Sequence, residues 1–243
     1  MRSWAPAPVR RLAVALLVLA AIVLPTLVTS WVLTPSAADV QQRVLERTTA
    51  LGVVLLGEDE VPPILAQAVV ATEDERFYSH HGIDSIGLGR AVLYDVANFC
   101  LCEGGSTITQ QLAKDVYLNG SDRGYNKLEG LVLAVKIEQV IGKGQIMADY
   151  LSVIPTGLNR YGVSGAACAY FHAPLGSLTL GQYALLAGVT QAPSLYDPTV
   201  DSGAALARRS HVVSAMLADR MISRDQASAA DAEPVLATQG PGC

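Results

Sequence analysis

An uninterrupted apolar run near the N-terminus constrains the fold of this chain more than any other feature. Residues 12–33 read LAVALLVLAAIVLPTLVTSWVL and contain no charged side chain. An α-helix rises about 1.5 Å per residue, so about 20 apolar residues cross the roughly 30 Å hydrocarbon core of a bilayer. The run therefore predicts one transmembrane helix. Pro25 is compatible with this prediction because membrane helices tolerate proline, and Trp31 suits the membrane interface.

The charges on either side of the run predict its orientation. Three arginines lie within residues 1–11, whereas all 22 acidic residues follow the run. Under the positive-inside rule, 1–11 is a cytoplasmic tail, 12–33 is a single-pass anchor in the cell membrane, and the rest of the chain is extracytoplasmic. A cleaved signal peptide is the alternative, with Ser36-Ala37-Ala38 as a small-residue cleavage site. In both cases the bulk of the chain works beyond the membrane.

The chain after the anchor is long enough for a sizeable core, and its pattern is mainly helical. We expect a connector with one short helix at 34–60, a single domain at 61–235 and a tail at 236–243. Val61-Pro62-Pro63 is expected to open the first helix of the domain, because proline is favoured at the first helical position. Alternating strand-like runs are nearly absent, and the segment after 226 is an Ala/Ser-rich tract. Helices are predicted at about 62–73, 84–99, 107–118, 127–141, 144–151, 163–171, 179–189 and 203–219.

The first segment whose side chains could take part in catalysis is ATEDERFYSHHGID, at 71–84. Its acidic residues directly follow an apolar helix, and aromatic and histidine residues come next. Taken singly, such an acid is far more often solvated than catalytic. A carboxylate at the end of an apolar helix is, however, partly desolvated, which raises its pKa and makes it a better general base near neutral pH. The pattern alone does not choose among Glu73, Asp74 and Glu75.

The second segment is GGSTITQQLAK, at 104–114. A Gly-Gly pair followed by Ser and Thr is typical of a helix N-cap, and the start of a helix offers free backbone N–H groups to an anion. Lys114 lies about two helical turns after Ser106, near the same face. A plain cap and a phosphate or pyrophosphate site fit this pattern equally well.

Together these two segments closely resemble the first two motifs of the family 51 glycosyltransferases, the peptidoglycan transglycosylases. That family includes domains of bifunctional penicillin-binding proteins and monofunctional membrane-anchored enzymes. The likeness extends over about residues 60–235. It implies a lysozyme-like, two-lobed helical domain that polymerises lipid II into glycan strands, with inversion at the anomeric carbon.

The resemblance also implies roles for individual residues. Glu73 would be the general base, and Lys114 would stabilise the departing pyrophosphate. The remaining matched positions are candidates for substrate binding or for shaping the site: Asp74, Phe77, His80, Gly105, Ser106, Thr107, Thr109, Gln110, Gln111, Arg123, Lys127 and Glu129. Expected partners are lipid II, the growing strand, the membrane and other cell-wall synthases.

We expect no required cofactor, although the resemblance leaves open a magnesium or manganese ion acting through the pyrophosphate. The sequence itself specifies no metal site, because His80 and His81 beside Cys100 and Cys102 do not supply a zinc ligand set. The formal net charge of −5 argues against nucleic acid as a partner. No Ser-x-x-Lys occurs, so no transpeptidase domain is expected.

The chain departs from the family pattern at several positions. The usual Arg-Lys-x-x-Glu is NKLEG here, with Gly130 in place of the carboxylate and Glu129 one residue early, about 100° away on a helix. Asp122, Ser152 and Gln182 replace an arginine, an asparagine and a glutamate, although Arg123 adjoins the first of them. The alternative is therefore a weak or inactive member that binds lipid II or synthesis partners. A lysozyme-like hydrolase is a third hypothesis.

Two further expectations concern residues outside the motifs. A disulfide between Cys168 and either Cys100 or Cys102 is chemically permitted outside the cytoplasm, and Cys243 is expected to be free. Arg208, Arg209 and His211 are expected to form a solvated helix face rather than a lipid-binding patch.

Overall fold

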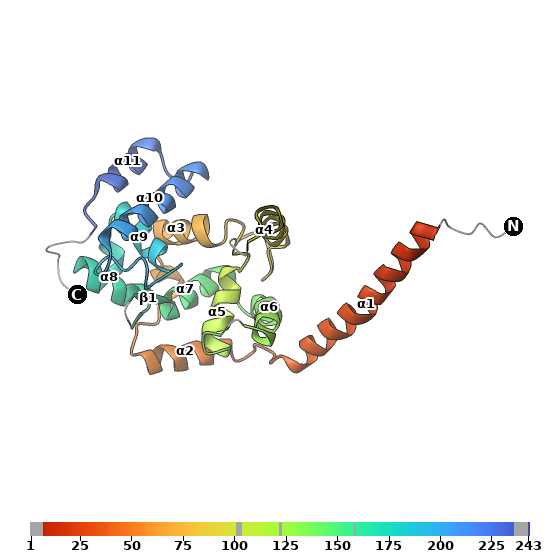
Figure 1. The fold of residues 1–243 in the computed structure, drawn as a ribbon. Helices are drawn as coiled ribbons and strands as arrows, with labels where there is room; N and C mark the ends of the chain where they lie inside the picture. Colours follow the sequence, from red (N-terminus) through yellow and green to blue (C-terminus); the bar gives the residue numbers. More distant parts are fainter. Residues whose placement is uncertain (1–6, 101–103, 122, 158, 236–242) are drawn as a thin grey trace. The chain divides into compact units, whose positions relative to one another are not determined.

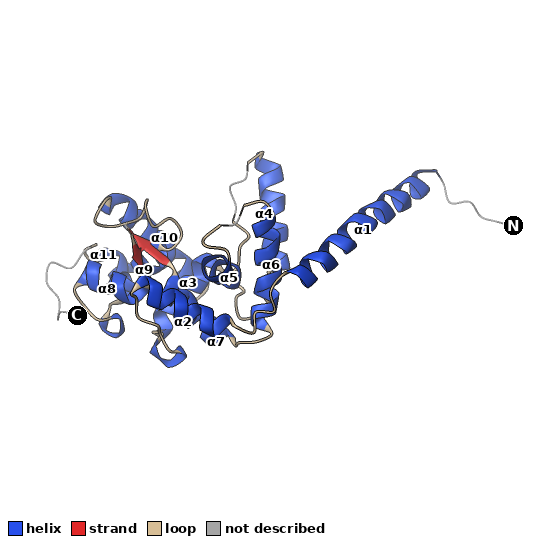
Figure 2. Cartoon of the chain, turned by 90° about the horizontal axis from the view of Figure 1, so that it is seen from below, coloured by secondary structure: helices blue, strands red, loops and turns tan. Residues whose placement is uncertain are grey.

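The computed structural model describes residues 7–100, 104–121, 123–157, 159–235 and 243 (Figures 1 and 2). Eleven α-helices and two short strands fall within these residues, which confirms the predicted mainly helical fold. The chain divides into two compact units, residues 1–36 and residues 37–243. Each unit is described separately below.

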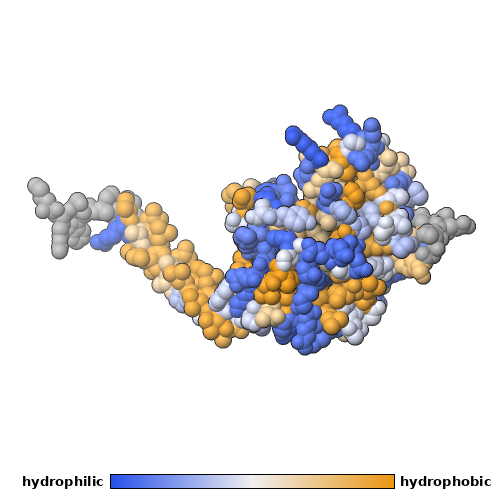
Figure 3. Space-filling model, turned by 180° about the vertical axis from the view of Figure 1, so that it is seen from behind, coloured by the Kyte–Doolittle hydropathy of each residue, from blue (hydrophilic) through white to orange (hydrophobic). Residues whose placement is uncertain are grey.

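The first unit contains α1, which runs from Ala7 to Leu33 with Pro25 inside it. The stretch Val9–Leu33 has a mean hydropathy of 2.7 and is exposed along almost all of its length, with Ser30 buried near its end, so by length and composition it could cross a membrane. Its surface is apolar along most of its length (Figure 3). The helix begins before the apolar run does, because the backbone hydrogen bonds of a helix continue through charged residues such as Arg10 and Arg11.

One group of helices in the second unit packs around α3. This helix begins at Pro63, within one residue of the predicted start, and buries apolar side chains such as Leu65 and Val69. No helix was predicted after 219, but α11 occupies the first part of the Ala/Ser-rich tract after 226. Ser223 caps it, and its alanines allow close packing on α10. The group comprises α3 (Pro63–Glu73), α9 (Leu180–Val189), α10 (Ser202–Ala218) and α11 (Arg224–Ala232).

A second group packs around α5 and α7 and includes the short helix of the predicted connector. This group comprises α2 (Val40–Leu51), α5 (Ile108–Tyr117), α6 (Tyr125–Glu138) and α7 (Lys143–Val153), with a short 3-10 turn, η1 (Glu58–Glu60). Gln41 donates to the buried carboxylate of Asp149 at 2.6 Å, and the Tyr117 hydroxyl donates to Asp39 at 2.8 Å. The helix of the connector is therefore an integral part of the domain.

A short antiparallel hairpin was not predicted. It pairs β1 (Pro155–Gly157) with β2 (Arg160–Tyr161), and it is too short to produce a readable alternation. Its strands are red in Figure 2. Arg160 anchors it by donating to the buried carboxylate of Asp197 at 3.1 Å. The helix α8 (Val163–Phe171) and the turn η2 (Leu175–Ser177) follow.

The cysteine prediction is partly wrong. Cys168 of α8 forms a disulfide with Cys243, which was expected to be free. Cys100 is also disulfide-bonded, whereas Cys102 lies outside the described residues. Sequence could not decide this pairing, because residues 75 positions apart meet only through the fold.

The remaining helix, α4 (Ser85–Asn98), exposes much of its apolar surface. Asp84 caps it by accepting from the backbone N–H groups of Ile86 and Gly87. Leu93 and Val96 are about 70% exposed, at 73% and 69%, and Phe99 just beyond the helix is 98% exposed. Such a cluster is unusual on a surface that faces only water.

Candidate active site

Glu73 is the last residue of α3, and the chain changes direction immediately after it. Asp74 leaves helical geometry, with φ −161° and ψ 72°. Its buried carboxylate accepts from His80 Nε2 at 2.9 Å and from the Ile108 backbone N–H at 3.0 Å. Burial raises the pKa of Asp74, while the hydrogen bonds from His80 and Ile108 oppose that shift. Asp74 thus fixes the loop after Glu73 to the start of α5.

The N-terminus of α5 is engaged by the protein itself. The Thr107 hydroxyl oxygen accepts from the Gln110 backbone N–H at 3.2 Å, as an N-cap does. The same hydroxyl donates to the Gly82 carbonyl at 2.8 Å, and Gln110 Nε2 donates to that carbonyl at 3.2 Å. The Asp74 carboxylate also accepts a hydrogen bond from the Ile108 backbone N–H, so protein groups already cap this end of the helix.

Gly82 is the point at which these contacts meet, which leads to a prediction. Its φ is +86°, and a Cβ there would lie 2.6 Å from the Ala134 carbonyl carbon. Gly82→Ala should therefore combine backbone strain with overpacking and cost about 3 kcal/mol of folding free energy. That corresponds to a fall in Tm of about 6–12 °C, measured by thermal unfolding.

Gly120 provides a matched control for this substitution. Its φ is also positive, at +78°, but a Cβ there would meet nothing within 4 Å. Gly120→Ala should show the backbone strain alone and a smaller fall in Tm. Equal falls for the two variants would contradict the packing argument at Gly82.

The carboxylate of Glu73 is held on both sides. Gln111 Nε2 donates to Oε2 at 3.1 Å, and Arg208 Nη2 lies 3.4 Å from Oε1. The Tyr150 hydroxyl in turn donates to Gln111 Oε1 at 3.3 Å. Burial raises the pKa of Glu73, and the negative charge of Asp74 raises it further. The Gln111 hydrogen bond and the positive charges of Arg208 and Lys114 lower it. The group is thus a buried carboxyl whose protonation depends on its cationic neighbours.

The expected solvated face of α10 is wrong for two of its three residues. Arg208 and Arg209 are buried, because α10 packs against α3, α9 and α11. His211 is exposed, as predicted. Arg208 reaches Glu73 across 135 residues of sequence, a contact that no local motif indicates.

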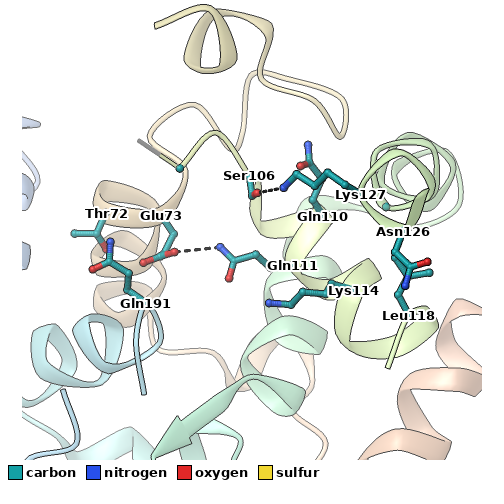
Figure 4. Close-up of a pocket in the computed structure, with 12 residues that line it drawn as sticks. Thr72, Glu73, Ser106, Gln110, Gln111, Lys114, Leu118, Asn126, Lys127 and Gln191 are labelled. Atoms are coloured by element: carbon teal, nitrogen blue, oxygen red, sulfur yellow. Dashed lines mark hydrogen bonds between the residues drawn. The ribbon is translucent and has the colours of Figure 1, made fainter. Parts of the chain in front are cut away.

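Two pockets open on Glu73. The first has a volume of about 250 Å³ and lies between α3 and α5 (Figure 4). Glu73 projects into it opposite Gln111 and Lys114, and Lys127 donates to Ser106 Oγ at 2.6 Å at its rim. Its lining also includes Thr72, Gly104, Gln110, Leu118, Asn126, Gly130 and Gln191.

The second pocket, of about 450 Å³, adjoins the first and shares Glu73, Ser106 and Gln191 with it. One wall comes from α10, through His211 and Asp219, and charged residues of both signs line it. Glu73 therefore lies where a cationic pocket and a pocket of mixed charge meet. This arrangement suits a proton acceptor between two bound groups.

Comparison with known proteins identifies the family of the chain. Residues 41–217 match the family described as Transglycosylase. The chain belongs to the transglycosylase family. Penicillin-binding protein 1A of Vibrio cholerae serotype O1 is 42% identical over 178 residues, which cover 73% of this chain and 22% of that protein. Penicillin-binding protein 1A of Escherichia coli K12 is 40% identical over 168 residues, covering 69% and 20%.

The chain thus spans about a fifth of the length of these relatives. Among solved structures, the crystal structure of penicillin-binding protein 1A from Haemophilus influenzae superposes with a TM-score of 0.45 at 23% identity. That superposition covers 78% of this chain and 19% of that one.

The two pockets contain most, but not all, of the predicted site residues. The residues that line one or both pockets are Glu73, Asp74, Gly105, Ser106, Thr107, Gln110, Gln111, Lys114 and Lys127. The residues that line neither are Phe77, His80, Thr109, Arg123 and Glu129. Phe77 is fully buried, and Thr109 donates to Glu138 at 2.6 Å.

Sequence reasoning missed Arg208, Gln191, Thr72 and Asn126 as site residues. It singled out Gly130 only as a missing carboxylate, and the structure places it in the lining of the first pocket. The described part of the chain contains no group of three or more His, Cys, Asp and Glu residues that could hold a metal ion.

Proposed function

We propose that the protein is a peptidoglycan glycosyltransferase that polymerises lipid II into glycan strands. The 4-hydroxyl of the acceptor sugar attacks the anomeric carbon of the growing chain with inversion. Its proton passes to Glu73, and the electron pair of the broken C–O bond leaves with the lipid pyrophosphate. The observation that carries the proposal is the buried Glu73 carboxylate opening on one pocket with Lys114 and Lys127.

The environment of Glu73 supports its role as the general base. Its carboxyl is shielded from water, which raises its pKa and increases its basicity once ionised. Two cations, Arg208 and Lys114, favour the ionised form that must accept the proton. A general base of this kind contributes about 10²–10⁴-fold to rate.

The cationic first pocket is the proposed site of the departing diphosphate. Lys114, Lys127 and Ser106 provide charge and hydrogen bonds for the negative charge that develops there. The acceptor sugar would then occupy the second pocket, with its hydroxyl toward Glu73. We propose no required cofactor; a magnesium or manganese ion would bind through the diphosphate.

We further propose that α1 is a retained anchor with a cytoplasmic N-terminus, and that the second unit is extracytoplasmic. The arginine-rich start of the chain supports this orientation. The disulfide Cys168–Cys243 supports an oxidising compartment, and the apolar face of α4 supports work at a bilayer surface. The growing strand and other cell-wall synthases are the proposed partners.

The test is incubation of the full chain, in detergent, with fluorescently labelled lipid II. Polymer separated by gel electrophoresis is the expected result. Tight binding of lipid II without polymer would instead support the alternative, a weak or inactive member of the family. Cleavage of preformed glycan would support a hydrolase, and either of these results would overturn the proposal.

Gly130→Glu is expected to increase the polymerisation rate. Gly130 lines the first pocket, and a Cβ there would meet only Leu118 Cδ1 at 3.5 Å, an ordinary contact. The family pattern that this chain resembles has a carboxylate at this position. We expect a gain of at least about tenfold, part of the 10²–10⁴ that an acid or base group contributes.

The control for this gain is Gly130→Gln, which adds the same bulk without the charge. It should leave the rate near or below that of the unmodified chain. If the Gln variant gained as much as the Glu variant, the carboxylate would not be responsible.

A further inference from the structure

Resting on the proposed function, we propose that Arg208 is a positioning residue for Glu73. It orients the carboxylate from α10 and keeps it ionised and ready to accept the proton. Arg208 itself lines neither pocket, so it acts on the substrate only through Glu73.

The contacts of Arg208 fix its guanidinium in one place. Nη2 lies 3.4 Å from Glu73 Oε1, and Nε donates to the Gly188 carbonyl at 3.3 Å. The guanidinium also lies over the Tyr196 ring, 5.7 Å from its centroid. Only 6% of the Arg208 side chain is exposed, so water screens its charge little.

The helix α9 leaves the space that this side chain needs. A Cβ on Gly188 would lie 2.9 Å from Arg208 Cγ, which is near the base of the side chain and not at its flexible end. Gly188 therefore allows an arginine to cross from α10 to the end of α3. A Gly188→Ala substitution would displace Arg208 without changing any charge.

Four charged or titratable groups act on Glu73 from the elements around it. Arg208 comes from α10, Lys114 from α5, Tyr150 from α7, and Asp74 follows Glu73 directly. Of the two cations, Lys114 is more exposed, at 28% of its side chain, and is therefore more screened. Burial and Asp74 raise the pKa of Glu73, whereas Arg208, Lys114 and the Gln111 hydrogen bond lower it. Without Arg208 only the last two would lower it, so the pKa of Glu73 would rise further.

The neighbouring arginine provides a matched control. Arg209 is also buried, but its guanidinium donates to the backbone carbonyls of Asp231 and Glu233, both at 2.8 Å, and of Pro234 at 3.3 Å. Its guanidinium holds the C-terminal segment, whereas the guanidinium of Arg208 reaches Glu73. Substitution of Arg209 should affect folding stability alone.

The experiment compares Arg208→Gln, Arg208→Lys, Gly188→Ala and Arg209→Gln in the full chain in detergent. The first readout is the pH dependence of polymerisation. Because the base must be ionised, Arg208→Gln should move the acid limb of kcat/KM to higher pH by about 1–3 units. Arg208→Lys keeps a cation and should show a smaller shift of the acid limb. Gly188→Ala displaces Arg208 and should also show part of the shift. Arg209→Gln should lower Tm and leave the limb in place.

The second readout does not require turnover. The ¹³C NMR signal of the Glu73 carboxyl carbon is followed against pH in protein labelled with ¹³C-enriched glutamate. This signal is assigned by its disappearance in Glu73→Gln. If the unmodified chain made no polymer, the proposed function would fail while this titration still decided the role of Arg208. An unchanged Glu73 titration in Arg208→Gln would overturn the inference. If that variant did not fold, an unchanged titration in both Arg208→Lys and Gly188→Ala would overturn it.

Discussion

Glu73→Gln should lower the rate of lipid II polymerisation by about 10²–10⁴-fold. The amide has the size of the carboxylate and retains a carbonyl oxygen for Gln111 and Arg208, but it cannot accept the proton of the attacking hydroxyl. Folding should be preserved. The measurement is the initial rate of polymer formation, with Tm recorded for the same preparation.

Glu75→Gln is the comparison within the same segment. Glu75 is 47% exposed and pairs with Arg76 and Arg90, so its carboxylate is solvated and screened. Its loss should cost far less activity than the loss of Glu73. Similar losses in the two variants would remove Glu73 from the role of base.

Lys114→Met should lower kcat by about 10²–10³-fold, in the range of other losses of a preorganised group that stabilises developing charge. Methionine has a similar length but carries no charge, and Lys114 projects into the first pocket opposite Glu73 (Figure 4). Because the pyrophosphate gains charge mainly in the transition state, kcat should fall more than KM rises. The measurement is steady-state polymerisation over a range of lipid II concentrations.

Two variants test whether this effect is specific to the charge in that pocket. Lys114→Arg should recover part of the rate, because it restores a cation. Arg224→Gln removes one positive charge from the exposed first turn of α11 and should leave the rate unchanged. A rise in KM at unchanged kcat for Lys114→Met would instead assign the lysine to ground-state binding.

Local sequence signals predicted the parts of the site that local structure builds. The end of α3 at Glu73 follows from an apolar helix that meets acidic residues, and the start of α5 follows from the cap at Thr107. Both signals lie within a few residues of the groups that they position. The family motifs extended them to Gln111 and Lys114, one and two turns further along α5.

The residues that sequence could not place depend on packing between distant elements. The local pattern around Arg208 and Arg209 resembles a solvated face, and only the packing of α10 on α3, α9 and α11 decides that they are buried. The absent side chain of Gly188, 20 residues earlier, gives Arg208 its path to Glu73. The pairing of Cys168 with Cys243 likewise depends on where the chain returns.

The exposed apolar residues of α4 have a practical consequence for handling the protein. Leu93, Val96 and Phe99 would meet solvent even in a shortened chain that began after α1. Removal of α1 would therefore not yield a well-behaved aqueous sample, because self-association through this face would compete with the monomer. Purification and crystallisation of either form call for an amphiphile that covers α4.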